Sequence, residues 1–126
     1  SKNEAILVRL HPRAALALVG PAGEHMESLE AEAGKPVFVQ ARPLFHVEHV
    51  ELKSGRTQEL KERMRQVHKG QKVRVTLDEG LGGENALAVV DGNLIEVLGG
   101  AERIGQEVEI RLMDTDKIVK RAEIFR

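Results

Sequence analysis

The residue types that could support chemistry gather most densely where two histidines alternate with carboxylates. His46 and His49 stand beside Glu48 and Glu51, and imidazole and carboxylate groups are both zinc ligands. In a strand, however, His46 and His49 point to opposite faces, so one shared ion would require an irregular backbone. We therefore interpret these side chains as surface polar residues and predict no metal site here.

Other polar groups give weaker indications of chemistry. Asp114 and Asp116 could share a face near a turn and hold a cation, but a solvated turn is the simpler interpretation. His11, directly before Pro12, is better explained as a helix-entry residue than as a general base. The chain has no cysteine, and it contains no Ser-His-Asp set, P-loop or dinucleotide fingerprint. We expect neither a complete active site nor a cofactor within this chain.

A Gly-x-x-Gly stretch with Gly20 and Gly23 at its ends separates two helical patterns. Glycines allow positive φ and let a phosphate backbone approach peptide N–H groups. The order helix, Gly-x-x-Gly, helix, strand resembles the KH class of RNA-binding modules, so both glycines are candidate RNA contacts. Pro21 and Ala22 add no positive charge, however, and Glu24 would compete with a phosphate at a helix N-terminus. A helix–helix turn without a ligand is the alternative.

Positive charge is concentrated in the centre of the chain. The formal net charge is −1, yet residues 53–74 carry eight Lys or Arg against two Glu. Such clustering favours phosphate contacts, whereas a solvated linker helix is the alternative. The candidate RNA-contacting cations of this segment and its neighbourhood are Lys61, Arg65, Lys69, Lys72 and Arg74, and a track over the C-terminal half would add Arg111, Lys117, Lys120 and Arg121.

The first half of the chain predicts a small α/β layer in the order β-α-α-β-β. Apolar, partly β-branched runs predict strands over 5–10 and 36–41, and an alternating run predicts a third over 47–52. In that third strand Val50 and Leu52 are expected to face inward. The strands are separated by helical patterns that begin at Pro12 and after Gly23 and end before Gly20 and at Gly34.

The second half predicts a small β-barrel preceded by a basic helix. A capping signal at Thr57 opens the helix, and Leu60, Met64 and Val67 give it one narrow apolar face. From Gly70 onward, short alternating runs and turn signals predict five strands, including a hairpin at Asp91-Gly92. Five strands in so short a segment imply a closed barrel of the OB or SH3 kind, because closure removes exposed edges.

The β-rich half resembles a TRAM domain. The residues that carry this resemblance are Gly70 to Val73, Ala88 to Gly92, Glu96-Val97 with Gly99 to Ala101, Gly105 to Val108, and Arg121 to Ile124. TRAM domains are five-stranded barrels that bind RNA and accompany a catalytic domain. The resemblance therefore implies an RNA-binding accessory barrel.

The first half, over about residues 4–52, resembles the C-terminal small domain of the ribonuclease E/G family. The resemblance rests on Ile6 to Val8, His11-Pro12, Ala15, Leu18, Leu29-Glu30, Gly34 to Pro36, Pro43-Leu44 and His49 to Leu52. The family consists of endoribonucleases that cleave single-stranded RNA with carboxylate-bound Mg²⁺. Its catalytic carboxylates lie upstream of the small domain, so the resemblance implies a non-catalytic region, with Mg²⁺ held by the catalytic domain of a parent enzyme.

These patterns together predict an α+β protein in three parts. Residues 1–53 form a small KH-like α/β domain, residues 54–69 a basic linker helix, and residues 70–126 an OB- or TRAM-like barrel. The expected function is an RNA-binding accessory region of a ribonuclease E/G-like endoribonuclease. Single-stranded RNA and an upstream catalytic domain are the expected partners, and RNA affinity is expected to fall steeply with salt.

Two alternatives to an RNA-binding region remain open. The near-neutral charge and the scarcity of aromatic residues favour a structural or oligomerisation domain without RNA contact, which would make a homo-oligomer. A nuclease in its own right would cleave RNA with Mg²⁺, but no carboxylate cluster indicates one. The chain lacks an apolar run of about 18 residues and a signal-peptide core, so we expect no membrane partner and a cytoplasmic location.

Overall fold

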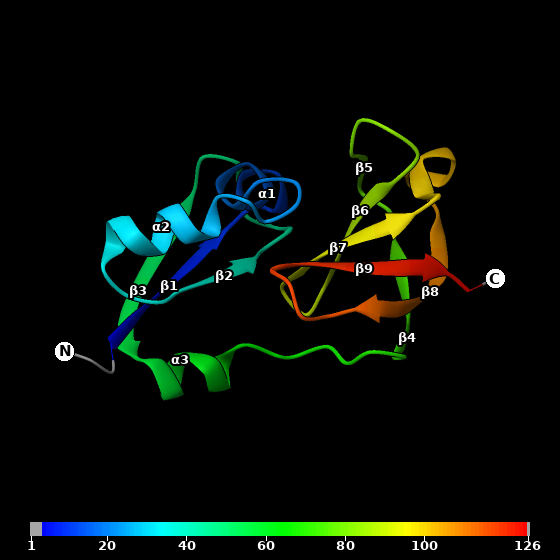
Figure 1. The fold of residues 1–126 in the computed structure, drawn as a ribbon. Helices are drawn as coiled ribbons and strands as arrows, with labels where there is room; N and C mark the ends of the chain where they lie inside the picture. The colour runs from blue at the N-terminus through cyan, green and yellow to red at the C-terminus, as the bar shows by residue number, and fades with distance from the viewer. Residues whose placement is uncertain (1–3, 126) are drawn as a thin grey trace. The chain divides into compact units, whose positions relative to one another are not determined.

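The computed structural model describes residues 4–125 of this α+β chain. It contains three α-helices and nine strands in the described part (Figure 1). The chain divides into two compact units, Ser1–Arg65 (unit 1) and Gln66–Arg126 (unit 2). In residues 4–125, no helix is long and apolar enough to cross a bilayer.

Unit 1 is built on a three-stranded sheet with the order β2-β1-β3. The central strand β1 (Glu4–Leu10) pairs parallel with β2 (Val37–Ala41) and antiparallel with β3 (Val50–Arg56). Its position follows from its composition, since Leu7 and Val8 are both buried although they point to opposite faces. A strand that is apolar on both faces needs cover on both sides, and helices provide it.

Two helices, α1 (Pro12–Val19) and α2 (Met26–Ala33), cross from β1 to β2. His11 caps α1, because its Nδ1 accepts a hydrogen bond from the Arg13 N–H at 3.1 Å, and Pro12 occupies the first turn. Helix α2 ends at Gly34, which has φ 69° and donates its N–H to the Glu30 carbonyl oxygen. The predicted roles of His11 and Gly34 at helix ends are thus confirmed.

Helix α3 (Thr57–Arg63) belongs to unit 1 and covers the other face of its sheet. Leu60 is 1% exposed and packs with Ala5 and Leu7, with Met64 at the margin of this cluster. The helix ends at Arg63, so residues 64–69 of the expected linker helix are not helical. Leu60 and Met64, two of the three residues of the predicted apolar face, pack against β1.

The prediction that Val50 and Leu52 face inward is wrong. Both lie on β3, but Val50 is 50% exposed and Leu52 is 71% exposed. The reason is the order of the sheet: β3 is an edge strand, and α1 and α2 pack against β1 and β2. An alternating apolar pattern fixes which face a side chain takes, but whether that face is covered depends on the neighbouring layer.

Unit 2 is a single curled sheet of six strands with the order β4-β8-β9-β7-β6-β5. Neighbouring strands are antiparallel except β7 and β9, which are parallel. The strands are β4 (Lys72–Thr76), β5 (Glu79–Gly80), β6 (Ala86–Val90), β7 (Asn93–Leu98), β8 (Glu107–Asp114) and β9 (Val119–Ile124). A short 3-10 helix, η1 (Gly100–Arg103), joins β7 to β8.

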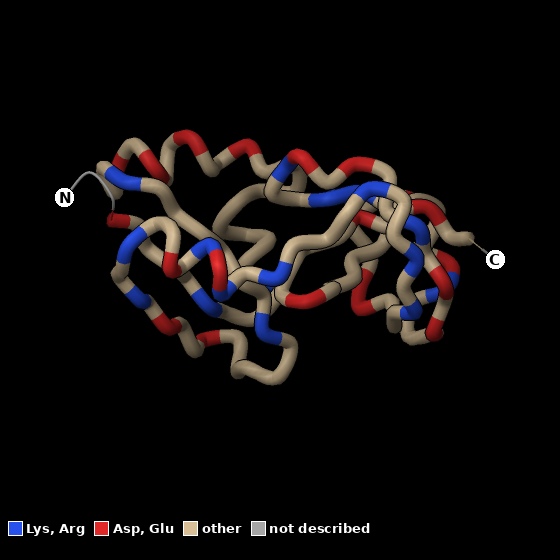
Figure 2. The backbone as a smooth tube through the Cα atoms, turned by 90° about the horizontal axis from the view of Figure 1, so that it is seen from below, with Lys and Arg blue, Asp and Glu red and all other residues tan. Residues whose placement is uncertain are grey.

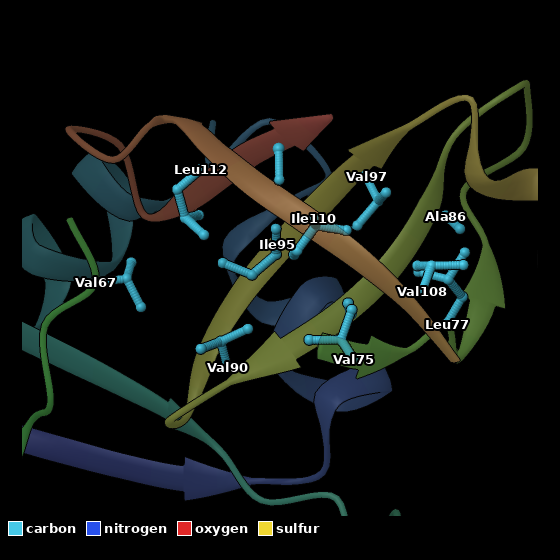
Figure 3. Close-up of a cluster of buried hydrophobic side chains, with 12 residues drawn as sticks. Val67, Val75, Leu77, Ala86, Val90, Ile95, Val97, Val108, Ile110 and Leu112 are labelled. Carbon is cyan, nitrogen blue, oxygen red and sulfur yellow. The ribbon is translucent and has the colours of Figure 1, made fainter. Parts of the chain in front are cut away.

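One apolar cluster fills the concave side of this curled sheet. Figure 3 shows Val75 of β4, Val90 of β6, Ile95 of β7 and Ile110 of β8 converging there. Because side chains alternate along each strand, every second residue of β8 enters the cluster and the residues between them point outward. Val67, the third apolar residue of the pattern that includes Leu60 and Met64, belongs to this core.

The expected hairpin joins β6 to β7, and two further elements were not expected. Asp91 has φ 49° and Gly92 has φ 82°, so both central residues have the positive φ that a tight two-residue hairpin turn favours. Strand β5 and helix η1 are absent from the elements predicted from the sequence. Both are too short to show periodicity, and β5 is defined only by its pairing with Leu87 and Ala86 of β6.

Gly100 is the position where added bulk should be most harmful to unit 2. A Cβ atom at Gly100 would lie 2.9 Å from the Ala86 Cβ and 3.0 Å from the Leu77 Cδ1, inside a tightly packed core. We expect Gly100→Ala to lower the free energy of unfolding by about 1–3 kcal/mol. Chemical denaturation followed by circular dichroism measures this, since the chain has no Trp or Tyr to report by fluorescence.

Gly83 provides the matched control. Nothing lies within 4 Å of its added Cβ, and its φ is outside the positive range. Gly83→Ala should change stability by no more than about 1 kcal/mol, toward greater stability. Equal destabilisation by both substitutions would contradict the close packing of η1 on β6.

Candidate nucleic-acid interface

The predicted cations are divided between the two units. Lys61 and Arg65 belong to unit 1, at helix α3 and just beyond it. The other seven belong to unit 2: Lys69, Lys72, Arg74, Arg111, Lys117, Lys120 and Arg121. Figure 2 shows that basic and acidic positions are interleaved along the backbone. Within each unit, a basic residue can therefore contribute positive charge to a surface only to the extent that no carboxylate is paired with it.

Strands β4, β8 and β9 bring part of the unit 2 set together on the convex side of the sheet. Lys72 of β4 is the register partner of Arg111 of β8, and Arg111 is in turn the partner of Glu123 of β9. These side chains point outward because their neighbours Ile110 and Leu112 enter the core. The sequence placed Lys72 and Arg111 far apart, and the sheet makes them neighbours.

Phe125 completes this group and was not predicted as a site residue. Its N–H donates to the Glu109 carbonyl oxygen at 2.7 Å, which extends the β8–β9 pairing by one residue. Its ring centroid lies 4.1 Å from the Lys72 Nζ and 5.7 Å from the Arg111 Cζ, and the residue remains 37% exposed. Both cations lie over the ring, which is the geometry of cation–π contacts. An exposed aromatic ring in a basic environment can also stack a nucleic-acid base.

Carboxylates offset most of the arginine charge on this side. Arg111 donates to Glu123 from both Nε, at 2.9 Å, and Nη2. The Arg74 Nη2 lies 3.0 Å from Glu107, and the Arg121 Nε lies 3.3 Å from Glu96. Lys72, in contrast, forms no ion pair within residues 4–125. A phosphate would meet Lys72 directly but would compete with Glu123 for Arg111.

Lys120 is the least suited of the predicted cations to a phosphate contact. Burial lowers the pKa of Lys120, against the opposing effect of nearby Asp114. Its Nζ donates to the Lys117 carbonyl oxygen at 3.0 Å. The ammonium group is therefore engaged with its own turn.

The Gly-x-x-Gly turn has no unused N–H group. Gly20 has φ 86° and Gly23 has φ 75°, as expected for such a turn. Their N–H groups, however, donate to the carbonyl oxygens of Leu16 and Gly20. The Ala22 N–H donates to the Glu24 Oε1 at 3.1 Å, and proline has no N–H to offer.

Glu24 therefore occupies the place in this turn that an anion would take. A Cβ atom on Gly20 would collide with the Glu24 carboxylate, and the φ of 86° also favours glycine at this position. Hydrogen bonds from the Ala22 N–H and from Glu24's own N–H hold the pKa of this carboxyl below its usual value. In this conformation the contact predicted for Gly20 and Gly23 gains no support.

The remaining candidate chemistry consists of local contacts. The His46 Nδ1 accepts from the Glu48 N–H at 3.1 Å, and the His49 Nε2 lies 3.2 Å from the Glu51 Oε2. Both histidines are exposed, as interpreted from the sequence. No group of three or more His, Asp or Glu residues that could hold a metal ion occurs within the described part of the chain.

Comparisons with known proteins add no family assignment. No family model matches the chain, and no curated protein matches it. Among solved structures, a conserved protein of Methanococcus maripaludis, determined in solution, is 28% identical. That match covers 48% of this chain and 83% of the other, with a TM-score of 0.41, and at this score we draw nothing from it about fold or function.

The hydrogen bonds to Glu24 predict an acid-sensitive contribution to stability. Because the folded-state pKa of Glu24 is lowered, its contribution is present above the pKa of the unfolded chain, about 4.3, and is lost as the pH falls through the lower folded value. Glu24→Gln should be less stable than the natural chain at neutral pH, and the difference should shrink as the pH falls below about 4.3. Chemical denaturation across this pH range measures it.

Glu48→Gln is the control for this titration, because Glu48 is an exposed glutamate in a loop of the same unit. Its effect on stability at neutral pH should be small. A stability difference for Glu24→Gln that persists unchanged at acid pH would contradict the role assigned to the carboxylate.

Proposed function

We propose that this chain is an RNA-binding accessory region and that the convex side of β4, β8 and β9 is its contact surface. The single observation behind the proposal is the cluster of Phe125, Lys72 and Arg111, which we call the Phe125 cluster. Single-stranded RNA is the favoured ligand, because its unpaired bases expose faces that can stack on an aromatic ring.

In this proposal one base stacks on Phe125 and the adjoining phosphates contact the two cations. Lys72 contributes directly, since it holds no carboxylate within residues 4–125. Arg111 contributes after exchanging Glu123 for a phosphate, which reduces the net gain from its charge. The salt dependence of affinity should therefore be shallower than the number of basic residues suggests, because paired arginines release fewer counterions.

The proposal includes a KH-like fold for unit 1 and an OB- or TRAM-like fold for unit 2. The element order β1-α1-α2-β2-β3 of unit 1 supports a KH-like relationship, and the curled sheet of unit 2 supports an OB- or TRAM-like barrel. The sequence resemblances to the ribonuclease E/G small domain and the TRAM domain favour an endoribonuclease as the parent protein. Mg²⁺ would then act in an upstream catalytic domain, and we assign it no ligand in this chain, because the described residues contain no suitable carboxylate group.

Removing the aromatic ring should weaken RNA binding strongly. Phe125→Ala is expected to raise the Kd for a labelled single-stranded RNA of about 15 nucleotides by about 5- to 150-fold, the loss expected for one stacked base. Phe125→Leu, which keeps apolar bulk without the π-face, should recover little of that loss. Fluorescence anisotropy at low salt provides the measurement.

Phe45 gives a matched control for Phe125. It also lies beside a cation, with the Arg42 Cζ 5.6 Å from its ring centroid, but it belongs to unit 1. Phe45→Ala should leave RNA affinity unchanged. Unchanged binding in Phe125→Ala, or an equal loss in Phe45→Ala, would rule out the Phe125 cluster as the contact surface.

Releasing Arg111 from Glu123 should strengthen binding. Glu123→Gln removes the competing carboxylate, so we expect a lower Kd and a steeper dependence of affinity on salt as Arg111 becomes available to phosphate. Glu59→Gln makes the same change in net charge at an exposed position of α3 and should have a much smaller effect. Equal effects of the two substitutions would indicate a general charge effect instead of a defined site.

A further inference from the structure

Unit 1 carries an apolar groove that the RNA proposal does not use. Leu18 of α1 and Leu29 of α2 line one side, and Val50 and Leu52 of β3 line the other. The groove has a volume of about 480 Å³. Glu32 of α2 is the one charged residue among its described lining residues. We call this feature the α2–β3 groove.

The groove is open because one layer of unit 1 is incomplete. Helices α1 and α2 pack against β1 and β2, while β3 lies at the far edge of the sheet. None of the eight residues of α2 is buried, although Leu29 and Ala33 face the groove. Both walls therefore present apolar side chains that nothing in unit 1 covers.

Exposed apolar residues also occur in the segment of the chain that precedes β3. Leu44 is 100% exposed and Val47 is 45% exposed, and with Val50 and Leu52 they make four of the seven large hydrophobic residues exposed among residues 4–125. Large exposed apolar patches mark interaction sites, and an uncovered edge strand favours association. The four exposed apolar residues within 44–52 are therefore concentrated in one segment, unlike apolar residues that are scattered singly over a surface.

We propose that the α2–β3 groove binds an amphipathic helix of a partner protein. A helix placed over β3 beside α2 would complete the helical layer on this face of the sheet. A strand added to the edge of β3 would extend the sheet and leave the groove unfilled. The apolar stripe of the partner helix seats between Leu29 and Leu52.

The acidic residues of α2 indicate which charge the partner helix carries beside its apolar stripe. Helix α2 carries Glu27, Glu30 and Glu32 and no Lys or Arg. Glu30 is engaged, since its Oε2 accepts from the Val37 N–H at 2.9 Å, whereas Glu32 lines the groove. The complementary partner has Lys or Arg beside its apolar stripe, on the side that meets α2. This proposal is independent of the RNA-binding surface on unit 2.

The test uses two designed helical peptides with the full chain. Both peptides have about 18 residues with Leu at i, i+3, i+4 and i+7, and they differ in having Lys or Glu beside the Leu stripe. Fluorescence anisotropy of the labelled peptides should show the Lys peptide binding the natural chain and the Glu peptide binding much more weakly. Glu32→Lys should reduce or reverse that preference.

Leu52→Asn should raise the Kd for the Lys peptide by about tenfold or more, as expected when the apolar contact of one leucine is lost. The substitution is compatible with folding because Leu52 is 71% exposed. Met113→Asn is the control: Met113 is 40% exposed and lies on β8 in unit 2, so its change should have no effect.

Three outcomes would overturn the proposal. The first is no binding of the Lys peptide, and the second is equal binding by the natural chain and Leu52→Asn. The third is a homodimer in light scattering that Leu52→Asn returns to monomer, since a second copy would then be the occupant. Amide shifts at Leu29 and Leu52 in an NMR titration with the Lys peptide would support the proposal.

Discussion

The alternation of side chains along β8 is the constraint on which the candidate interface depends. Val108, Ile110 and Leu112 enter the core of unit 2, and this requires Glu109 and Arg111 to point outward. Pairing with β4 and β9 then places Lys72 and Phe125 beside Arg111. A one-residue slip of β8 would bury the charges and expose the core, so the stability of unit 2 and the geometry of the Phe125 cluster depend on the same register.

Local charge pairing limits what the basic residues of this protein can do. Count alone suggests a long positive track, but Arg74, Arg111 and Arg121 each have a glutamate partner. Such exposed pairs are weak individually, so a phosphate can displace them at modest cost. The proposed interface consequently depends more on one aromatic ring and the lysine that lies over it than on total charge. The turn at Gly20 follows the same principle, because Glu24 already uses the hydrogen bond that an external anion would need.

The sequence predicted those features that depend on local pattern. Continuous apolar runs predicted β1 and β2, and the Asp91-Gly92 dipeptide predicted the β6–β7 hairpin. The inward direction predicted for Val50 was wrong, because coverage of an edge strand is decided by helices elsewhere in the chain. Strand β5 and helix η1 were missed because two to four residues carry no periodicity.

The candidate site was likewise predicted only where it depends on local sequence. Lys72 and Arg111 were selected as cations, but their adjacency is a property of strand order, which no local pattern encodes. Phe125 was a recognisable clue, as the one aromatic residue of the β-rich half. Phe125 becomes a candidate site residue through the pairing of β9 with β8, because this pairing brings its ring centroid to 4.1 Å from the Lys72 Nζ.

The most direct test of the proposed RNA contact surface is an NMR titration of the isotope-labelled chain with a single-stranded RNA of about 15 nucleotides, the length scale of known single-strand sites. We expect the largest amide shifts at Lys72, Arg111 and Phe125, together with broadening of the Phe125 ring signals. Shifts centred on the turn at Gly20 and Gly23, or no shifts at the Phe125 cluster while RNA binds, would contradict the proposal.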